Sequence, residues 1–138
     1  GPYSVAPDGA GNLYVADTSN ATIRKVVLRT GLVTTVAGMA QMSGSIDGVG
    51  ETARFTWPYG VAIDSVGNLF VTDGKEHTLR KIQLPNAVVT TIAGGARQGG
   101  VKLGMLPGRL NVPFGVAALP TGEIFLAVQG ENAILAIR

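Results

Sequence analysis

The sequence repeats itself, and this repeat limits the possible folds more than any other feature. Residues 2–38 align with residues 58–94 at an offset of 56, with 19 identical residues in the 37 aligned positions. The opening of the unit returns a third time from Pro113, at an offset of 55 from Pro58. Self-similarity at such a period indicates copies of one supersecondary unit that bury their apolar faces against each other.

Each unit contains four short runs rich in Val, Ile, Leu, Tyr and Thr, separated by Gly, Asn, Asp and Pro. Runs of this kind between turn residues predict β-strands joined by hairpins. The 20 glycines and 7 prolines exclude a mainly helical chain, because both residues break helix interiors. Four strands per unit at this period are typical of one propeller blade with a long connector.

The number of units predicts an incomplete β-propeller. The expected fold is all-β, with about three four-stranded antiparallel blades in one domain over residues 1–138, the third blade lacking its last strand. Propellers close with about 4–8 blades, so three blades leave apolar faces open. We expect further blades of a larger propeller, or a second copy of the chain, to cover them. The predicted parts are blade 1 at 2–38, a connector at 39–57, blade 2 at 58–94, a connector at 95–112 and blade 3 at 113–138.

Three segments of the second unit carry a family resemblance. They are 60–64 (GVAID), 67–73 (GNLFVTD) and 78–82 (TLRKI). These segments and their counterparts in the first unit resemble NHL repeats, and residues 43–58 resemble the long inter-repeat segment of one NHL subtype. The resemblance covers nearly the whole chain. It implies a β-propeller, most often six-bladed, that serves mainly as a binding scaffold.

The resemblance implies several kinds of function. NHL propellers bind proteins, RNA or small ligands, and a few relatives are lyases or hydrolases. A protein–protein interaction scaffold is the leading hypothesis, because loops on a rigid frame carry binding residues. The alternatives are a propeller lyase or hydrolase, whose metal would be held by blades partly missing here, and RNA binding through a basic patch. The resemblance also favours a secreted or cell-surface location. No apolar run approaches the roughly 18 residues of a membrane span.

The acidic and histidine residues do not form a recognisable catalytic set. The chain has no cysteine and one histidine, His77, so neither thiolate chemistry nor a zinc site of several nitrogen ligands is expected. Asp17 and Asp73 recur at the end of the second run, where we expect them to accept hydrogen bonds from backbone N–H groups. The Gly-spaced acidic segment 47–51 is expected to be a connector, because a calcium site needs about six to eight oxygen ligands. The sequence predicts no catalytic residue, metal site or cofactor.

Basic residues are the main binding candidates. The net charge of +2, from 11 basic and 9 acidic residues, does not by itself argue for nucleic acid. Between Glu76 and Glu123, however, the chain has basic residues and no acidic one. A basic patch attracts RNA or an acidic protein, whereas scattered cations only solubilise a blade surface. The basic candidates are Arg80, Arg97, Lys102 and Arg109.

Trp57 completes the set of candidate binding residues. It is the one tryptophan of the chain and has no counterpart in the other units. Tyr3, Tyr59 and Phe114 instead share one repeat position, which favours a packing role for them. A partner that stacks on aromatic side chains, such as single-stranded RNA, would therefore be expected at Trp57.

Overall fold

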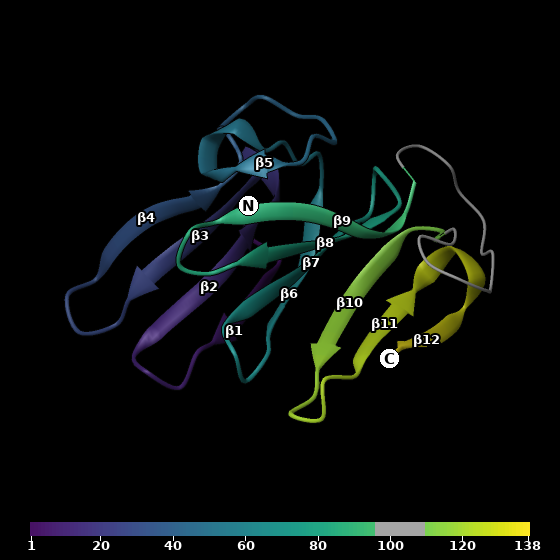
Figure 1. Cartoon of the computed structure of the whole chain (residues 1–138). Coiled ribbons are helices and arrows are strands. Elements are labelled where there is room, and N and C mark those ends of the chain that lie inside the picture. The colour runs from purple at the N-terminus through teal and green to yellow at the C-terminus, as the bar shows by residue number, and fades with distance from the viewer. Residues whose placement is uncertain (96–109) are drawn as a thin grey trace.

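Figure 1 shows the computed structural model of the chain, which describes residues 1–95 and 110–138. Within these residues the strands form three antiparallel sheets of four, five and three strands. The predicted all-β fold and partial propeller are confirmed, including a last blade of three strands. None of the helices in the described part of the chain is long and apolar enough to cross a membrane.

Each sheet is one blade, and apart from β5 its strands are neighbours in chain order. The first sheet contains β1 (Ser4–Pro7), β2 (Asn12–Asp17), β3 (Thr22–Val27) and β4 (Leu32–Ala37). The second contains β6 (Pro58–Ile63), β7 (Asn68–Asp73), β8 (Thr78–Gln83) and β9 (Val88–Gly94), with β5 (Gly48–Val49) at its edge. The third contains β10 (Pro113–Ala118), β11 (Ile124–Val128) and β12 (Ala133–Ile137). Short 3-10 turns lie at η1 (Thr18–Asn20), η2 (Gly50–Thr52) and η3 (Gln129–Glu131).

A side-chain hydrogen-bond motif closes the first hairpin of blades 1 and 2. The Asp8 carboxylate accepts hydrogen bonds from the backbone N–H groups of Ala10 (2.7 Å) and Asn12 (3.0 Å) and from the Asn12 side-chain amide (2.6 Å). Asp64 and Asn68 repeat the arrangement in blade 2. An aspartate bonded to the backbone two residues ahead stabilises a tight turn, so the repeated Asp and Asn set the hairpin.

The blades lie side by side with their first strands adjacent, β1 beside β6 and β6 beside β10 (Figure 1). Gly60 permits the second approach, because a Cβ there would lie 2.5 Å from the backbone oxygen of Phe114. Thr72 bridges the same gap: its hydroxyl donates to that oxygen (2.6 Å) and accepts from the Gly60 N–H (2.9 Å). One apolar core lies between blades 1 and 2, and a second lies between blades 2 and 3. The large buried side chains of the first core are Tyr14, Ile23, Phe55, Val61, Leu69, Val71, Ile82 and Val89.

The connector 39–57 contains a strand that the sequence pattern did not predict. Strand β5 adds to the outer edge of blade 2, where Gly48 pairs with Val89 and Val49 with Val88. A pair of residues is too short to show the alternation that identifies a strand in a sequence. The connector therefore belongs physically to the blade that follows it.

Candidate functional site

Aromatic side chains from all three blades meet at one end of the molecule. Tyr59 stacks on Phe114 with ring centroids 4.3 Å apart, and Tyr3 lies edge-on to Tyr59 at 5.1 Å. Trp57 extends the group, with its ring 6.2 Å from that of Tyr59. Such offset and edge-on pairs are the preferred aromatic geometries. We call Tyr3, Trp57, Tyr59 and Phe114 the aromatic rim cluster.

The repeat explains why these rings converge. Tyr3, Tyr59 and Phe114 each follow a proline at the start of a blade's first strand or, for Tyr3, just before it, and these first strands are neighbours in space. The packing role expected from their shared repeat position is present, because the three rings contact each other. Gly74 makes room for the middle ring, since a Cβ there would lie 2.5 Å from Tyr59.

Two members of the aromatic rim cluster are open to solvent. Tyr3 is 63% exposed and Trp57 is 44% exposed. The Lys75 ammonium lies 4.4 Å from the centroid of the Trp57 ring, a cation–π contact. Burial raises the pKa of the Tyr59 hydroxyl above 10.0, and the neighbouring Tyr3 and Asp73 add to this shift, so Tyr59 stays a neutral donor at physiological pH. The aromatic rim cluster and the neighbouring Lys75 together present aromatic ring faces, one cation and phenol hydroxyls to a ligand.

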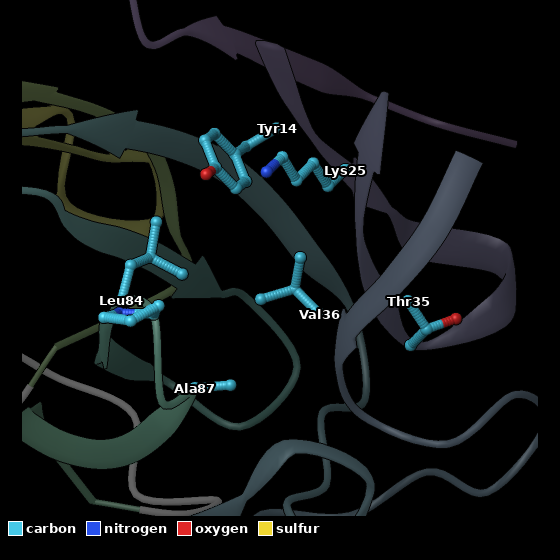
Figure 2. Close-up of a pocket in the computed structure, with 7 residues that line it drawn as sticks. Tyr14, Lys25, Thr35, Val36, Leu84 and Ala87 are labelled. Atoms are coloured by element: carbon cyan, nitrogen blue, oxygen red, sulfur yellow. The ribbon is translucent and has the colours of Figure 1, made fainter. Parts of the chain in front are cut away.

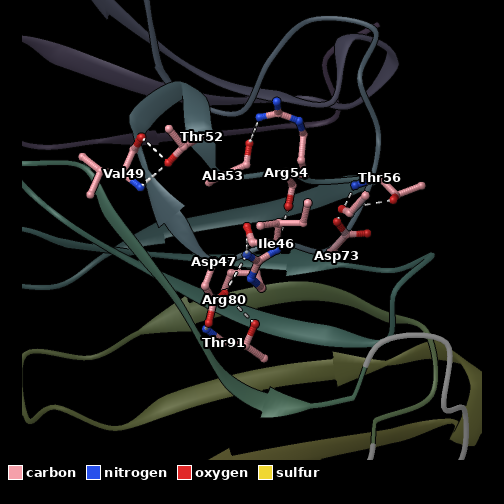
Figure 3. A network of polar contacts seen from close by, with 11 residues as sticks. Ile46, Asp47, Val49, Thr52, Ala53, Arg54, Thr56, Asp73, Arg80 and Thr91 are labelled. Atoms are coloured by element: carbon pink, nitrogen blue, oxygen red, sulfur yellow. Dashed lines mark hydrogen bonds and ion pairs between the residues drawn. The ribbon is translucent and has the colours of Figure 1, made fainter.

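Arg80 lies inside the protein, in contrast to its expected place in a basic surface patch. Its side chain is 0% exposed, and the guanidinium donates to the backbone oxygens of Arg54 (2.9 Å) and Ile46 (2.8 Å) and to the Asp47 carboxylate (2.8 Å), as Figure 3 shows. The Phe55 ring lies over it at 5.0 Å. Arg80 therefore contributes no charge to the surface and instead holds the connector on blade 2.

The other basic candidates, Arg97, Lys102 and Arg109, lie outside the described residues. Their part in a basic patch stays a prediction.

Asp47 has a structural partner rather than a metal site. Besides Arg80, its carboxylate accepts the Thr91 backbone N–H (3.0 Å) and the Thr91 hydroxyl (2.9 Å). Burial raises the pKa of Asp47, but the Thr91 hydrogen bonds and the Arg80 charge outweigh burial and hold it below 3.8. Within residues 1–95 and 110–138, no three His, Asp or Glu side chains gather to hold a metal ion.

Asp73 takes the backbone role expected of it. Its carboxylate accepts the N–H groups of Thr56 (2.6 Å), Trp57 (2.9 Å) and Glu76 (3.3 Å), and part of this arrangement appears in Figure 3. Burial raises the pKa of Asp73, and the Glu76 charge raises it further. The three hydrogen bonds lower it, but by less, so the pKa lies above its ordinary value. The Asp73 carboxylate therefore holds the end of the connector through Thr56 and Trp57. This contact positions Trp57 in the aromatic rim cluster.

His77 is also engaged in structure. It adopts the left-handed backbone conformation (φ 57°) at the turn between β7 and β8, and its Nδ1 accepts the Val112 N–H at 3.0 Å. No nucleophile among the described residues is paired with it in the hydrogen-bond network. The imidazole thereby ties the segment before β10 to the turn between β7 and β8.

Figure 2 shows a pocket of about 260 Å³ between blades 1 and 2. The Lys25 side chain ends beside the Tyr14 ring there, and apolar groups such as Val36 and Leu84 form much of the wall. A proton-transfer site needs an acid or base whose pKa lies near the pH at which the protein works. Burial instead raises the pKa of the Tyr14 hydroxyl above 10.0. The pocket therefore offers one ammonium and no acid–base pair.

Sequence reasoning missed two features of the site. The first is Lys75, whose contact with Trp57 depends on how the turn after β7 folds over the connector. The second is the convergence of the three repeat-position rings with Trp57 into one surface. The sequence did contain one sign of this convergence, because Tyr3, Tyr59 and Phe114 share one repeat position before or within the first strand of each blade.

Comparisons with known proteins point to one family of repeats. No protein-family model matches the chain. NHL repeat-containing protein 2 of Gallus gallus is 32% identical over 147 residues, covering 99% of this chain and 20% of that protein. Protein SUPPRESSOR OF QUENCHING 1, chloroplastic, of Arabidopsis thaliana is 31% identical over 139 residues, covering 95% of this chain and 13% of that protein. The chain therefore spans a fifth or less of the length of these curated relatives.

Solved structures with a similar fold include binding proteins and enzymes. A Bacteroides thetaiotaomicron protein of unknown function has a TM-score of 0.88 and 27% identity, covering 99% of this chain and 34% of that one. An auxiliary nutrient binding protein from the same organism has a TM-score of 0.79 and 22% identity, covering 94% and 35%. Virginiamycin B lyase from Staphylococcus aureus has a TM-score of 0.63 and 17% identity, covering 100% and 38%. The last two show the fold alone.

Proposed function

Because the chain belongs to the NHL-repeat β-propeller family, we propose that it works as a protein-interaction scaffold that binds a partner at the aromatic rim cluster. The observation that carries the proposal is the gathering of rings from three blades at one end, with Tyr3 and Trp57 exposed. Tyr and Trp are enriched among the residues that dominate binding energy at protein interfaces. Exposed rings held by neighbouring rings also lose little side-chain entropy on binding.

The chemistry of the cluster indicates what part of a partner it would take. The Tyr3 and Trp57 faces suit an apolar or aromatic anchor side chain. The Lys75 ammonium beside them suits a carboxylate at the border of the contact, where charge favours the correct orientation. The expected partner segment therefore combines an apolar anchor with an acidic neighbour.

A binding role fits the described residues better than catalysis. The Asp73 and Asp47 carboxylates are occupied by backbone N–H groups and by Arg80, and the His77 imidazole accepts a backbone N–H. A general acid or base needs a hydrogen-bonding atom free to reach the substrate. These groups stabilise the blades instead.

The experiment compares partner capture by matched surface variants. The intact protein is isolated from cells as wild type, Tyr3→Ala, Trp57→Ala, and the control Leu28→Ala, and its bound proteins are quantified by mass spectrometry. Leu28 is an exposed apolar residue in the turn after β3, at the opposite end of the blade. We expect Tyr3→Ala and Trp57→Ala to lose the same partner, which Leu28→Ala retains.

Two results would contradict the proposal. If the same partners remain with both rim variants at wild-type amounts, the aromatic rim cluster is not the binding surface. If the captured material is RNA that is lost when Arg97, Lys102 and Arg109 are changed to Glu but kept by Trp57→Ala, the basic-patch hypothesis is favoured instead.

A further inference from the structure

Tyr14 carries a hydroxyl that its repeat counterparts lack. The counterparts in blades 2 and 3 are Phe70 and Phe125, so the packing of a blade needs only an aromatic ring at this position. Tyr14 is 5% exposed, and its hydroxyl forms no hydrogen bond with any residue that the structure describes. Tyr14 lines the pocket of about 260 Å³ between blades 1 and 2 (Figure 2). A nearly buried polar group without a protein partner needs water or a ligand to satisfy it, which makes this hydroxyl a candidate ligand contact.

The rest of this pocket combines one cation with an apolar wall. Among the described residues that line it, Lys25 is the one with a charge, and its side chain ends beside the Tyr14 ring (Figure 2). Lys25 is partly buried and forms no ion pair within residues 1–95 and 110–138. The apolar wall comes from both blades and consists of Val36, Leu84, Pro85 and Ala87. A mainly apolar pocket with a few polar groups is typical of a small-molecule site.

The apolar wall is not repeated in every blade. Pro85 and Ala87 lie in the turn between β8 and β9, and the corresponding residues in the turn of blade 1 are Arg29 and Gly31. The pocket also lies between two blades that face each other, so it is not part of the open face of an end blade. The combination of a tyrosine hydroxyl, an ammonium and an apolar turn is therefore particular to this pair of blades.

One acidic side chain limits the charge that the pocket accepts. The Asp8 carboxylate accepts hydrogen bonds from Asn12, which hold its pKa below 3.8, so it stays ionised. Its charge acts on both Lys25 and Tyr14. One negative charge on a ligand pairs with the ammonium, whereas a second charge is repelled by Asp8. The electrostatics therefore favour a monoanion over a phosphate or a dicarboxylate.

We propose that this pocket binds a small monocarboxylate with an apolar body, of the arylacetate or branched short-chain type. Its carboxylate accepts hydrogen bonds from the Lys25 ammonium and the Tyr14 hydroxyl, and such charge-assisted bonds are strong. Its apolar body packs against Leu84 and Pro85 in the turn of blade 2. The pocket volume lies below the range of drug-sized sites, so long-chain lipids and large ring systems do not fit. This inference does not depend on the aromatic rim cluster being a partner site.

Phenylacetate and 4-methylpentanoate are the aryl and branched-alkyl probes that test the proposal. Each is titrated into the intact protein, and binding is measured by saturation-transfer-difference NMR of the probe. Ligands of this size bind with a Kd of roughly 1 mM, so the titration extends about ten-fold beyond that concentration. We expect saturable binding of at least one probe. Methyl phenylacetate keeps the shape of phenylacetate without its charge, and it should bind about ten-fold more weakly or not at all.

Tyr14→Phe and Lys25→Gln test whether the probe binds in this pocket. Tyr14→Phe removes only the hydroxyl and leaves the ring that blades 2 and 3 carry at this position, so the fold is kept. Each variant should weaken the bound probe about ten-fold, because each removes one hydrogen bond to a charged group. Lys81→Gln is the matched control, since Lys81 has the repeat position of Lys25 but does not line the pocket. It should leave affinity unchanged, and circular dichroism checks the strand content of all three variants.

Several results would overturn the proposal. Neither probe binds saturably, or methyl phenylacetate binds as well as phenylacetate. Affinity in Tyr14→Phe equals that of wild type, or Lys81→Gln loses as much affinity as Lys25→Gln. Tighter binding of phenylphosphonate as its dianion would show that the pocket selects phosphate-like groups, against the limit set by Asp8.

Discussion

Replacing Arg80 by methionine tests whether the buried guanidinium holds the connector on blade 2. The change removes three hydrogen bonds of 2.8–2.9 Å, two of them to backbone oxygens, and keeps a long unbranched side chain under Phe55. Breaking a buried ion pair costs about 3–5 kcal/mol. Asp47 is 48% exposed and regains solvation, so the lower end, about 3 kcal/mol, is expected. For a chain of this size this corresponds to a fall in Tm of about 10 °C.

Thermal and urea unfolding, followed by circular dichroism, measure this loss for Arg80→Met. Trp57 fluorescence provides a second signal, because the tryptophan lies in the same connector, three residues after Arg54, whose backbone oxygen Arg80 binds. The matched control is Arg24→Met at the same repeat position, which should leave stability nearly unchanged because no described residue bonds to Arg24. Equal stability of Arg80→Met and wild type, or equal losses in the two variants, would refute the assigned role of Arg80.

Three other predictions follow from the contacts above. Because the pKa of Asp47 is held below 3.8, its ion pair stabilises the fold fully above pH 3.8 and is lost as the pH falls through the lower folded pKa. Acid unfolding below pH 3.8 should therefore be less steep in Asp47→Asn, and unchanged steepness would be evidence against the pairing. Gly60→Ala should cost about 1–3 kcal/mol in urea unfolding because its Cβ would meet a backbone oxygen at 2.5 Å, whereas Gly115→Ala, with a 3.5 Å contact, should cost far less. Lys75→Gln should cost about 0.5–1 kcal/mol or less in thermal unfolding, since the Trp57 contact is exposed, and a larger loss would indicate another role.

The repeat made most of the fold predictable. The strands and their hairpins follow from local patterns, such as the Asp8 and Asn12 pair that closes the first turn and recurs in blade 2. The backbone role of Asp73 was expected from its recurrence, but its counterpart Asp17 accepts the Asn20 side-chain amide instead. The Asp8 turn and the Asp73 contacts are both interactions within a single repeat and the segment next to it, where sequence distance is small.

The position of Arg80 was less predictable. The adjacent Arg80 and Lys81 face opposite sides of β8, but alternation alone does not say which side the connector covers. That choice depends on β5 pairing with β9 and on Phe55 entering the core, contacts that the sequence pattern of the connector does not reveal. The aromatic rim cluster was missed for a related reason. The rings of Tyr3, Tyr59 and Phe114 are about 55 residues apart in the chain and meet only because the first strands of the three blades are neighbours in space.

The attachment of residues 44–57 to the blade that follows them bears on how such repeats can be duplicated or exchanged. A genetic break near residue 43 would move a blade together with its own Asp47 and Phe55, so the transplanted piece would arrive with its arginine already neutralised. A break near residue 57 would separate Arg80 from its acceptors and make the hybrid depend on a compatible donor. Chimeric propellers joined before the connector should therefore express and fold more readily than those joined after it.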